Sequence, residues 1–128
     1  MTVTYSATVK TARMTAVRDQ IDAGGAAGKL EICSAAYASV LATITLGYSG
    51  ASTGTISGDV LTLAGFPRSD TSADNSGTAA VARIRTSANA DVITGLTVGT
   101  SGTDVVLDST SITAGQTVTI SSATFTHA

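Results

Sequence analysis

Apolar positions near the start of the chain recur with the period of a helix. Met14, Val17 and Ile21 stand at i, i+3 and i+7, which places them on one face of a helix. A pair of glycines follows, and glycine favours the left-handed conformation that commonly ends helices. The pattern therefore predicts one helix over about residues 8–23.

From Lys29 onward the spacing of apolar positions changes to two, the period of a β-strand. Leu30 and Ile32 alternate with polar neighbours, and Ala82 and Ile84 do the same further along the chain. The runs are rich in valine, isoleucine and threonine, which suit a pleated surface. They predict seven or eight strands at intervals of about ten residues.

The connections between these runs carry their own signals. Residues 58–59 read Gly-Asp between two β-rich runs, which predicts a two-residue hairpin. The last apolar positions change parity between Ile120 and Ala123, which predicts a β-bulge at the two serines between them. The polar stretch 65–77, around the single proline, is expected to be the least structured loop.

Short strands at even spacing, with no helices available for crossovers, favour an all-β fold. We expect an antiparallel β-sandwich or jelly-roll over about residues 28–127, preceded by the helix. A length of 128 residues fits one domain, so the whole chain, 1–128, is predicted to be a single unit.

The composition is weakly charged. Charged residues make up 12% of the chain, about half of the roughly 25% found in ordinary soluble domains. Serine and threonine together outnumber the charged residues more than twofold. Surfaces with few charges resist association poorly. The composition therefore favours a self-associating subunit or a component of an assembly, with a marginally stable monomer as the competing interpretation.

Charge and hydropathy also limit the classes of partner. The net charge is −2, and the seven lysines and arginines are scattered, whereas nucleic-acid binding needs clustered positive charge. No apolar run is long enough to span a membrane, and the first residues lack the apolar segment of a signal peptide. We expect no nucleic-acid partner and no membrane association.

Candidate catalytic residues are few. His127, the single histidine, stands one residue from the end of the chain, whereas a general base needs a fixed position. Cys33 is the single cysteine, which excludes an internal disulfide and fits synthesis in a reducing compartment. It could act as a nucleophile only beside an activating base, and Lys29 is the nearest candidate on its strand face. We predict no catalytic residues and no enzyme, with Cys33 in a half-buried strand or at an interface.

Metal and cofactor sites are expected to be absent as well. Zinc sites need several Cys or His ligands, and the chain has one of each. Asp70, Asp74 and Asn75 could offer oxygen ligands to Ca²⁺, but their spacing matches no EF-hand loop and such residues also satisfy loop backbones. The glycine-containing stretch 99–104 lacks the helix and lysine of a phosphate-binding loop, and is predicted to be a turn.

Three stretches of the chain, in the same order, resemble a family of small structural proteins encoded by tailed bacteriophages and prophages. They are residues 11–32, 69–84 and 99–120, which read TARMTAVRDQIDAGGAAGKLEI, SDTSADNSGTAAVARI and GTSGTDVVLDSTSITAGQTVTI. The resemblance runs through most of the chain. It implies a virion component made in the bacterial cytoplasm, and it brings no catalytic residues with it.

Among virion roles the resemblance favours a capsid decoration (cement) protein. Such proteins are commonly homotrimers that bind the major capsid protein on the outside of the head. The terminal segments and the outward face of the strand at 30–34 are the expected contact regions. A tail, baseplate or fibre-associated subunit is the alternative, as is a glycan-binding module of the virion, for which Tyr5, Tyr37 and Tyr48 are the available aromatics with a polar group.

Overall fold

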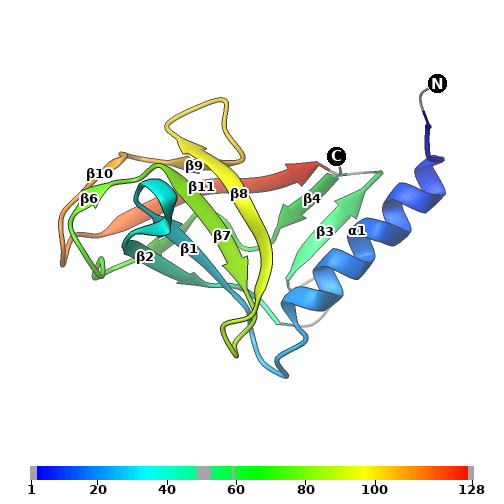
Figure 1. The fold of residues 1–128 in the computed structure, drawn as a ribbon, viewed down its shortest axis with the longest axis horizontal. Coiled ribbons are helices and arrows are strands. Elements are labelled where there is room, and N and C mark those ends of the chain that lie inside the picture. Colours follow the sequence, from blue (N-terminus) through cyan, green and yellow to red (C-terminus); the bar gives the residue numbers. More distant parts are fainter. Residues whose placement is uncertain (1–2, 49–52, 59, 127–128) are drawn as a thin grey trace.

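The computed structural model describes residues 3–48, 53–58 and 60–126. Within those ranges the chain is mostly β with one helix, as the sequence predicts (Figure 1). In chain order the elements are α1 (Ala7–Ile21), β1 (Lys29–Cys33), the 3-10 turn η1 (Ala35–Tyr37), β2 (Val40–Thr45), β3 (Gly54–Ser57), β4 (Val60–Leu63), β5 (Arg68–Asp70), β6 (Gly77–Thr78), β7 (Val81–Arg85), β8 (Asp91–Gly99), β9 (Val105–Leu107), β10 (Ser111–Ile112) and β11 (Val118–Thr126).

The eleven strands of the described residues exceed the seven or eight predicted. Four of them, β5, β6, β9 and β10, contain only two or three residues. Strands of that length are too short for an alternation of apolar and polar residues to be recognised. β5 and Gly77 of β6 lie inside the stretch 65–77, so four residues of the loop that was expected to be the least structured belong to strands.

α1 confirms the predicted helix to within two residues at each end. The side-chain oxygen of Ser6 caps its first turn, accepting a hydrogen bond from the Val9 N–H at 3.3 Å. Met14 and Ile21 are buried against the sheet. Beyond the helix Gly25 has φ +78°, the left-handed conformation expected after a helix end. No helix in the described ranges is long and apolar enough to cross a membrane.

Nine strands form one curled, mixed sheet in the order β2-β1-β7-β8-β9-β11-β4-β3, with β5 paired to β11 beside that path. β6 and β10 form a separate two-stranded sheet. The pairs are antiparallel except for β8 and β9, which run parallel with Val98 opposite Val105. The prediction of a wholly antiparallel fold is therefore wrong at this pair, and a jelly-roll is not confirmed.

The parallel pair depends on a loop that Asp104 folds back onto β8. Asp104 Oδ2 accepts hydrogen bonds from the N–H and the hydroxyl of Thr97, each at 3.0 Å. The Asp104 N–H donates in return to Thr97 Oγ1 at 2.9 Å. The turn predicted at 99–104 thus returns the chain beside β8 in the same direction. Alternation of apolar and polar residues indicates that a strand is present, but it does not indicate the direction of the strand. The parallel pairing of β8 and β9 therefore could not be predicted from the sequence pattern.

β11 connects the parts of the sheet. It pairs in succession with β5, β9 and β4. Its register against β9 shifts between Ile120 and Ser122, which confirms the predicted bulge. The shift lets Ile120 and Ala123, which have opposite parity, both point into the core.

The hairpin of β3 and β4 is the one predicted from its turn residues. Ser57 pairs with Val60, so the connection has two residues. Gly58 takes the first of these positions with φ +61°, which a residue with a Cβ rarely adopts. Asp59 lies outside the described residues.

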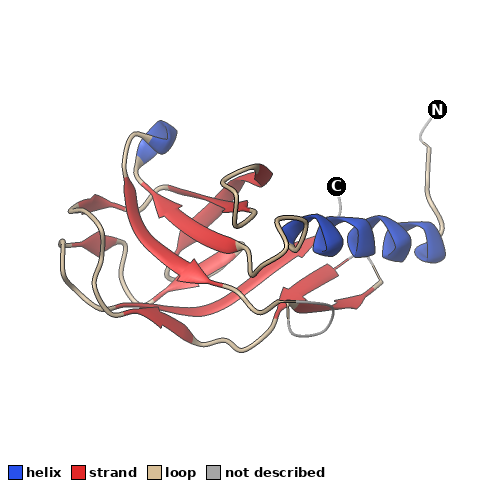
Figure 2. Ribbon diagram, turned by 90° about the horizontal axis from the view of Figure 1, so that it is seen from below, coloured by secondary structure: helices blue, strands red, loops and turns tan. Residues whose placement is uncertain are grey.

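α1 lies along this hairpin and covers the outer edge of the sheet at β3 (Figure 2). Thr11 Oγ1 donates a hydrogen bond to the Gly58 carbonyl at 2.9 Å, and Arg18 Nη1 donates to the Gly54 carbonyl at 3.2 Å. Side chains of the helix are therefore hydrogen-bonded to a backbone carbonyl at each end of β3. An edge strand covered in this way cannot readily pair with another chain.

The opposite edge of the sheet, β2, is closed by side chains of β5. Asp70 Oδ2 accepts a hydrogen bond from the Thr43 N–H at 3.0 Å, and Arg68 Nη1 donates to the Thr45 carbonyl at 2.9 Å. These contacts cross a polar groove of about 360 Å³ between the two strands. Because β5 also pairs with β11, the strands from β2 round to β5 form a barrel-like curl that is closed by side chains.

We predict that replacing Asp70 with alanine loosens this closure. The change removes the acceptor used by the N–H groups of Thr43 and Ser72. The free energy of unfolding, measured by urea denaturation, is expected to fall by about 1–3 kcal/mol.

Asp108→Ala is the control for this measurement, because Asp108 is an exposed aspartate at the end of β9. Its cost is expected to stay below about 0.5 kcal/mol. Equal losses in the two variants would contradict the proposed closure of the β2 edge.

Candidate functional site

The residues considered for catalysis are not brought together as a reactive group. Cys33 is completely buried at the end of β1, and its Sγ lies 3.9 Å from the Glu31 carbonyl oxygen. Burial raises the pKa of the Cys33 thiol, which keeps it protonated and weakly nucleophilic near neutral pH. Lys29 lies at the far end of the same strand, with Glu31 between the two. His127 lies outside the described residues.

The three residues considered as calcium ligands instead attach the loop after β5 to β2. Besides the contact of Asp70 with Thr43, Asp74 Oδ2 accepts a hydrogen bond from Thr43 Oγ1 at 2.9 Å. Asn75 Nδ2 donates to the Val40 carbonyl at 2.8 Å. In the part of the chain that the structure describes, no three His, Cys, Asp or Glu side chains gather closely enough to hold a metal ion.

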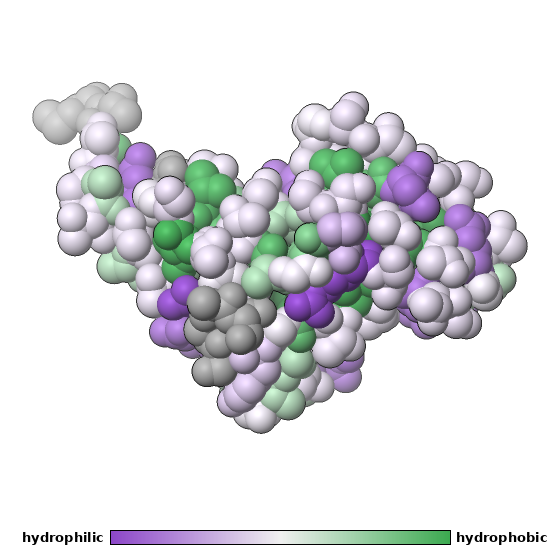
Figure 3. All heavy atoms as spheres, turned by 180° about the vertical axis from the view of Figure 1, so that it is seen from behind, coloured by the Kyte–Doolittle hydropathy of each residue, from purple (hydrophilic) through white to green (hydrophobic). Residues whose placement is uncertain are grey.

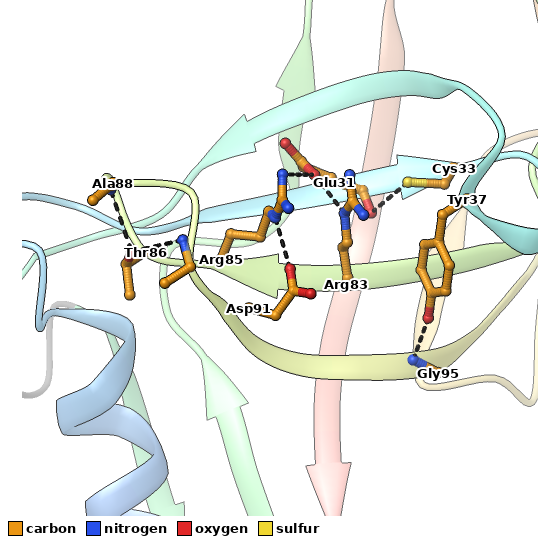
Figure 4. Close-up of polar contacts among 10 residues, drawn as sticks. Glu31, Cys33, Tyr37, Arg83, Arg85, Thr86, Ala88, Asp91 and Gly95 are labelled. Carbon is orange, nitrogen blue, oxygen red and sulfur yellow. Dashed lines mark hydrogen bonds and ion pairs between the residues drawn. The ribbon is translucent and has the colours of Figure 1, made fainter.

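A network of ion pairs covers the outer face of β1, β7 and β8 (Figure 4). Glu31 accepts a hydrogen bond from Arg83 Nε at 2.7 Å, and its Oε1 lies 3.8 Å from Arg85 Nη1. Arg85 Nε in turn donates to Asp91 Oδ1 at 2.7 Å. The network alternates in charge along the direction of strand pairing, which favours the register of all three strands.

Tyr37 closes one end of this network. The guanidinium of Arg83 lies 5.3 Å from the centre of the Tyr37 ring, and the Tyr37 hydroxyl accepts a hydrogen bond from the Gly95 N–H. Ala36 and Tyr37 have φ of 57° and 58°, a left-handed conformation that costs free energy in residues with a Cβ. The contacts of the Tyr37 ring compensate for that cost and hold η1 over the sheet.

This arrangement covers part of the surface that was expected to contact a partner. The outward residues of β1 include Glu31, which is 6% exposed, and Cys33, which is 0% exposed. Both side chains are therefore inaccessible to another molecule. Glu31, Arg83 and Arg85 were visible in the sequence as polar residues of alternating runs. Their meeting could not be seen, because β1 and β7 are distant in the chain.

Apolar side chains are exposed instead at the other expected contact region, the N-terminal segment. Val3, Tyr5 and Val9 are 72%, 47% and 41% exposed. The guanidinium of Arg13 lies 4.8 Å from the centre of the Tyr5 ring and adds a positive charge beside them. We call residues 3–13 the N-terminal arm. Figures 1 and 2 show that the first turn of α1 extends beyond the β3–β4 hairpin.

The three tyrosines considered for glycan binding lie apart. Tyr5 belongs to the N-terminal arm, Tyr37 is held by Arg83 in the ion-pair network, and Tyr48 follows β2 with 47% of its surface exposed. Among the described residues, the arm is the segment that carries more than one exposed large apolar side chain, and it is therefore the candidate site for contact with another molecule.

We predict that the ion-pair network serves stability. Glu31→Gln removes the charge between Arg83 and Arg85 while keeping the size of the side chain. The unfolding free energy is expected to fall by about 1–3 kcal/mol, because charged hydrogen bonds at a buried position are lost.

Asp91→Asn is the matched control at the exposed end of the network, where the Asp91 side chain is 50% exposed. It is expected to cost less than about 1 kcal/mol. A larger loss for Asp91→Asn than for Glu31→Gln, measured by urea denaturation, would show that the buried charge is not the centre of the network.

Comparisons of the chain with models of known protein families, with curated proteins and with solved structures find no match.

Proposed function

We propose that this chain is a structural protein of a bacteriophage virion, namely a capsid decoration (cement) protein. It is made in the cytoplasm of the host bacterium and binds the major capsid protein on the outside of the head as a homotrimer. The phage context is taken from the resemblance of residues 11–32, 69–84 and 99–120, and the mode of action from the surface of the folded chain.

The exposed apolar residues of the N-terminal arm are the observation that carries this proposal. Val3, Tyr5 and Val9 lie on a segment that the sheet of the same chain does not cover. Exposed apolar side chains that gather on one segment are candidates for protein contact. Full burial of an aliphatic or aromatic side chain contributes about 1.5–3 kcal/mol, so a partner that covers the arm gains binding energy from few residues.

The remaining surface suits a subunit that packs against large assemblies. Figure 3 shows one face on which residues of intermediate hydropathy predominate and strongly hydrophilic residues form only small groups. Serine, threonine and glycine are the most abundant residues of that kind in the chain. Such a surface can approach another protein without the cost of burying unpaired charge.

Both outer edges of the sheet are covered, which disfavours unspecific pairing with the strands of other chains. β2 is covered by side chains of β5, and β3 by α1. Open strand edges promote unspecific pairing between chains. A subunit that accumulates in many copies before assembly benefits from edges that are already occupied.

On the capsid, each copy would stabilise the shell by burying surface across neighbouring capsid subunits. Specific interfaces bury about 1,200–2,000 Å² in total. Contacts repeated around a lattice add up even when each is weak. The shell thereby gains resistance to the pressure of packaged DNA, and no reaction at the subunit is required.

We expect the purified chain to cosediment with capsids assembled from the major capsid protein encoded in the same phage genome. Binding should saturate at a fixed number of copies per capsid subunit, because the contact sites follow the lattice. Isolated tails from the same phage are the control.

Binding to tails and not to capsids would replace the cement role with the tail, baseplate or fibre-associated alternative. Failure to bind either particle, together with binding to host-surface glycans, would favour the glycan-binding module.

A further inference from the structure

A small groove follows the N-terminal arm along α1. It has a volume of about 280 Å³ and is formed where the second half of the helix meets the start of β8. Its lining includes Ala16 and Gln20 of the helix, and Ala90 and Asp91 at the start of β8. We call this site the α1–β8 groove.

The α1–β8 groove complements the arm in polarity and in charge. Its walls include the small apolar side chains of Ala16 and Ala90, both exposed to solvent. It also carries the carboxylate of Asp91, which is half exposed although Oδ1 pairs with Arg85. The arm presents the Tyr5 ring with the guanidinium of Arg13 beside it.

The Tyr5 ring cannot reach the groove of its own chain. Tyr5 precedes α1, and the first lining residue of the groove, Ala16, stands nine residues after the helix start at Ala7, about 14 Å along the axis at a rise of 1.5 Å per residue. An intact helix keeps that separation. A contact between the Tyr5 ring and the groove must therefore join different molecules.

We propose that the arm of one copy of this chain docks into the α1–β8 groove of a second copy. The Tyr5 ring packs against the wall formed by Ala16 and Ala90. Arg13 of the docked arm faces Asp91. The arm and the groove are different surfaces, so the contact is heterologous, and it leaves one free arm and one free groove on each pair.

A heterologous contact repeats from copy to copy until it closes a ring or continues as a filament. The homotrimer of the proposed function corresponds to closure after three copies. Only the number of copies in the ring, three, rests on the proposed function. The contact itself rests on the exposure of Val3, Tyr5 and Val9 and on the groove.

The test is the mass of the full chain in solution, measured by sedimentation at several concentrations. We expect the native chain to form a closed oligomer. Tyr5→Ser combined with Val9→Ser should give a monomer of 12.6 kDa, because it removes the apolar part of the arm. Tyr48→Ser is the matched control, because Tyr48 and Tyr5 are both 47% exposed, and it should leave the mass unchanged.

The groove is tested separately with Ala90→Arg, which fills it from the sheet side, and with Ala16→Arg, which fills it from the helix side. Each should also give a monomer. Both positions are exposed, and circular dichroism with thermal melting verifies that the variants fold.

A mixture of the arm variant and a groove variant gives the sharpest result. Each retains the surface that the other lacks, so the mixture should form a one-to-one dimer that grows no further. A native chain that stays monomeric up to about 1 mM would overturn the proposal, because its association free energy would then be weaker than about −4 kcal/mol. An arm variant with undiminished mass, a Tyr48→Ser variant that dissociates equally, or a mixture that stays monomeric would overturn it as well.

The capsid-binding assay separates this inference from the proposed function. Oligomers that form through arm and groove but bind no capsid would refute the decoration role and leave the self-contact standing. An arm variant that keeps both its mass and its capsid binding would refute the self-contact and leave the decoration role standing.

Discussion

The structure depends on closure of the curled sheet between β2 and β5. Two side chains make that closure: Asp70 accepts from the Thr43 N–H, and Arg68 donates to the Thr45 carbonyl. Backbone groups of an edge strand are strong hydrogen-bonding groups that need partners. With these groups satisfied inside the chain, the aliphatic core is enclosed with few aromatic residues, and the β2 edge is withdrawn from contact with other molecules.

Closure of the edges decides which surfaces remain for function. α1 occupies the β3 edge, and the ion-pair network with Tyr37 covers the outer face of β1. Among the described residues, exposed large apolar side chains gather in the N-terminal arm, and Tyr48 is a single further one. The same helix therefore covers the β3 edge with residues from Thr11 onward, while Val9 in its first turn is exposed.

The sequence predicted those features that depend on near neighbours. The helix, the hairpin turn at Gly58 and the bulge after Ile120 were all predicted, because turn residues and a change of parity are local signals. The parallel pairing of β8 with β9 was missed, because it depends on how Asp104 folds its loop onto Thr97. The same limit applies to the site. The arm was expected as a terminal segment, whereas the ion-pair network and the α1–β8 groove join residues far apart in the chain.

The most direct test of the account is a cryo-electron microscopy map of the intact virion at a resolution that shows side chains. The decoration role predicts copies of this chain around local symmetry axes on the outside of the head, with the first turns of α1 buried against neighbouring protein. A map that places the chain only in the tail would contradict it. So would a map that shows the copies joined through the edges of β2 or β3, with Val3, Tyr5 and Val9 in solvent.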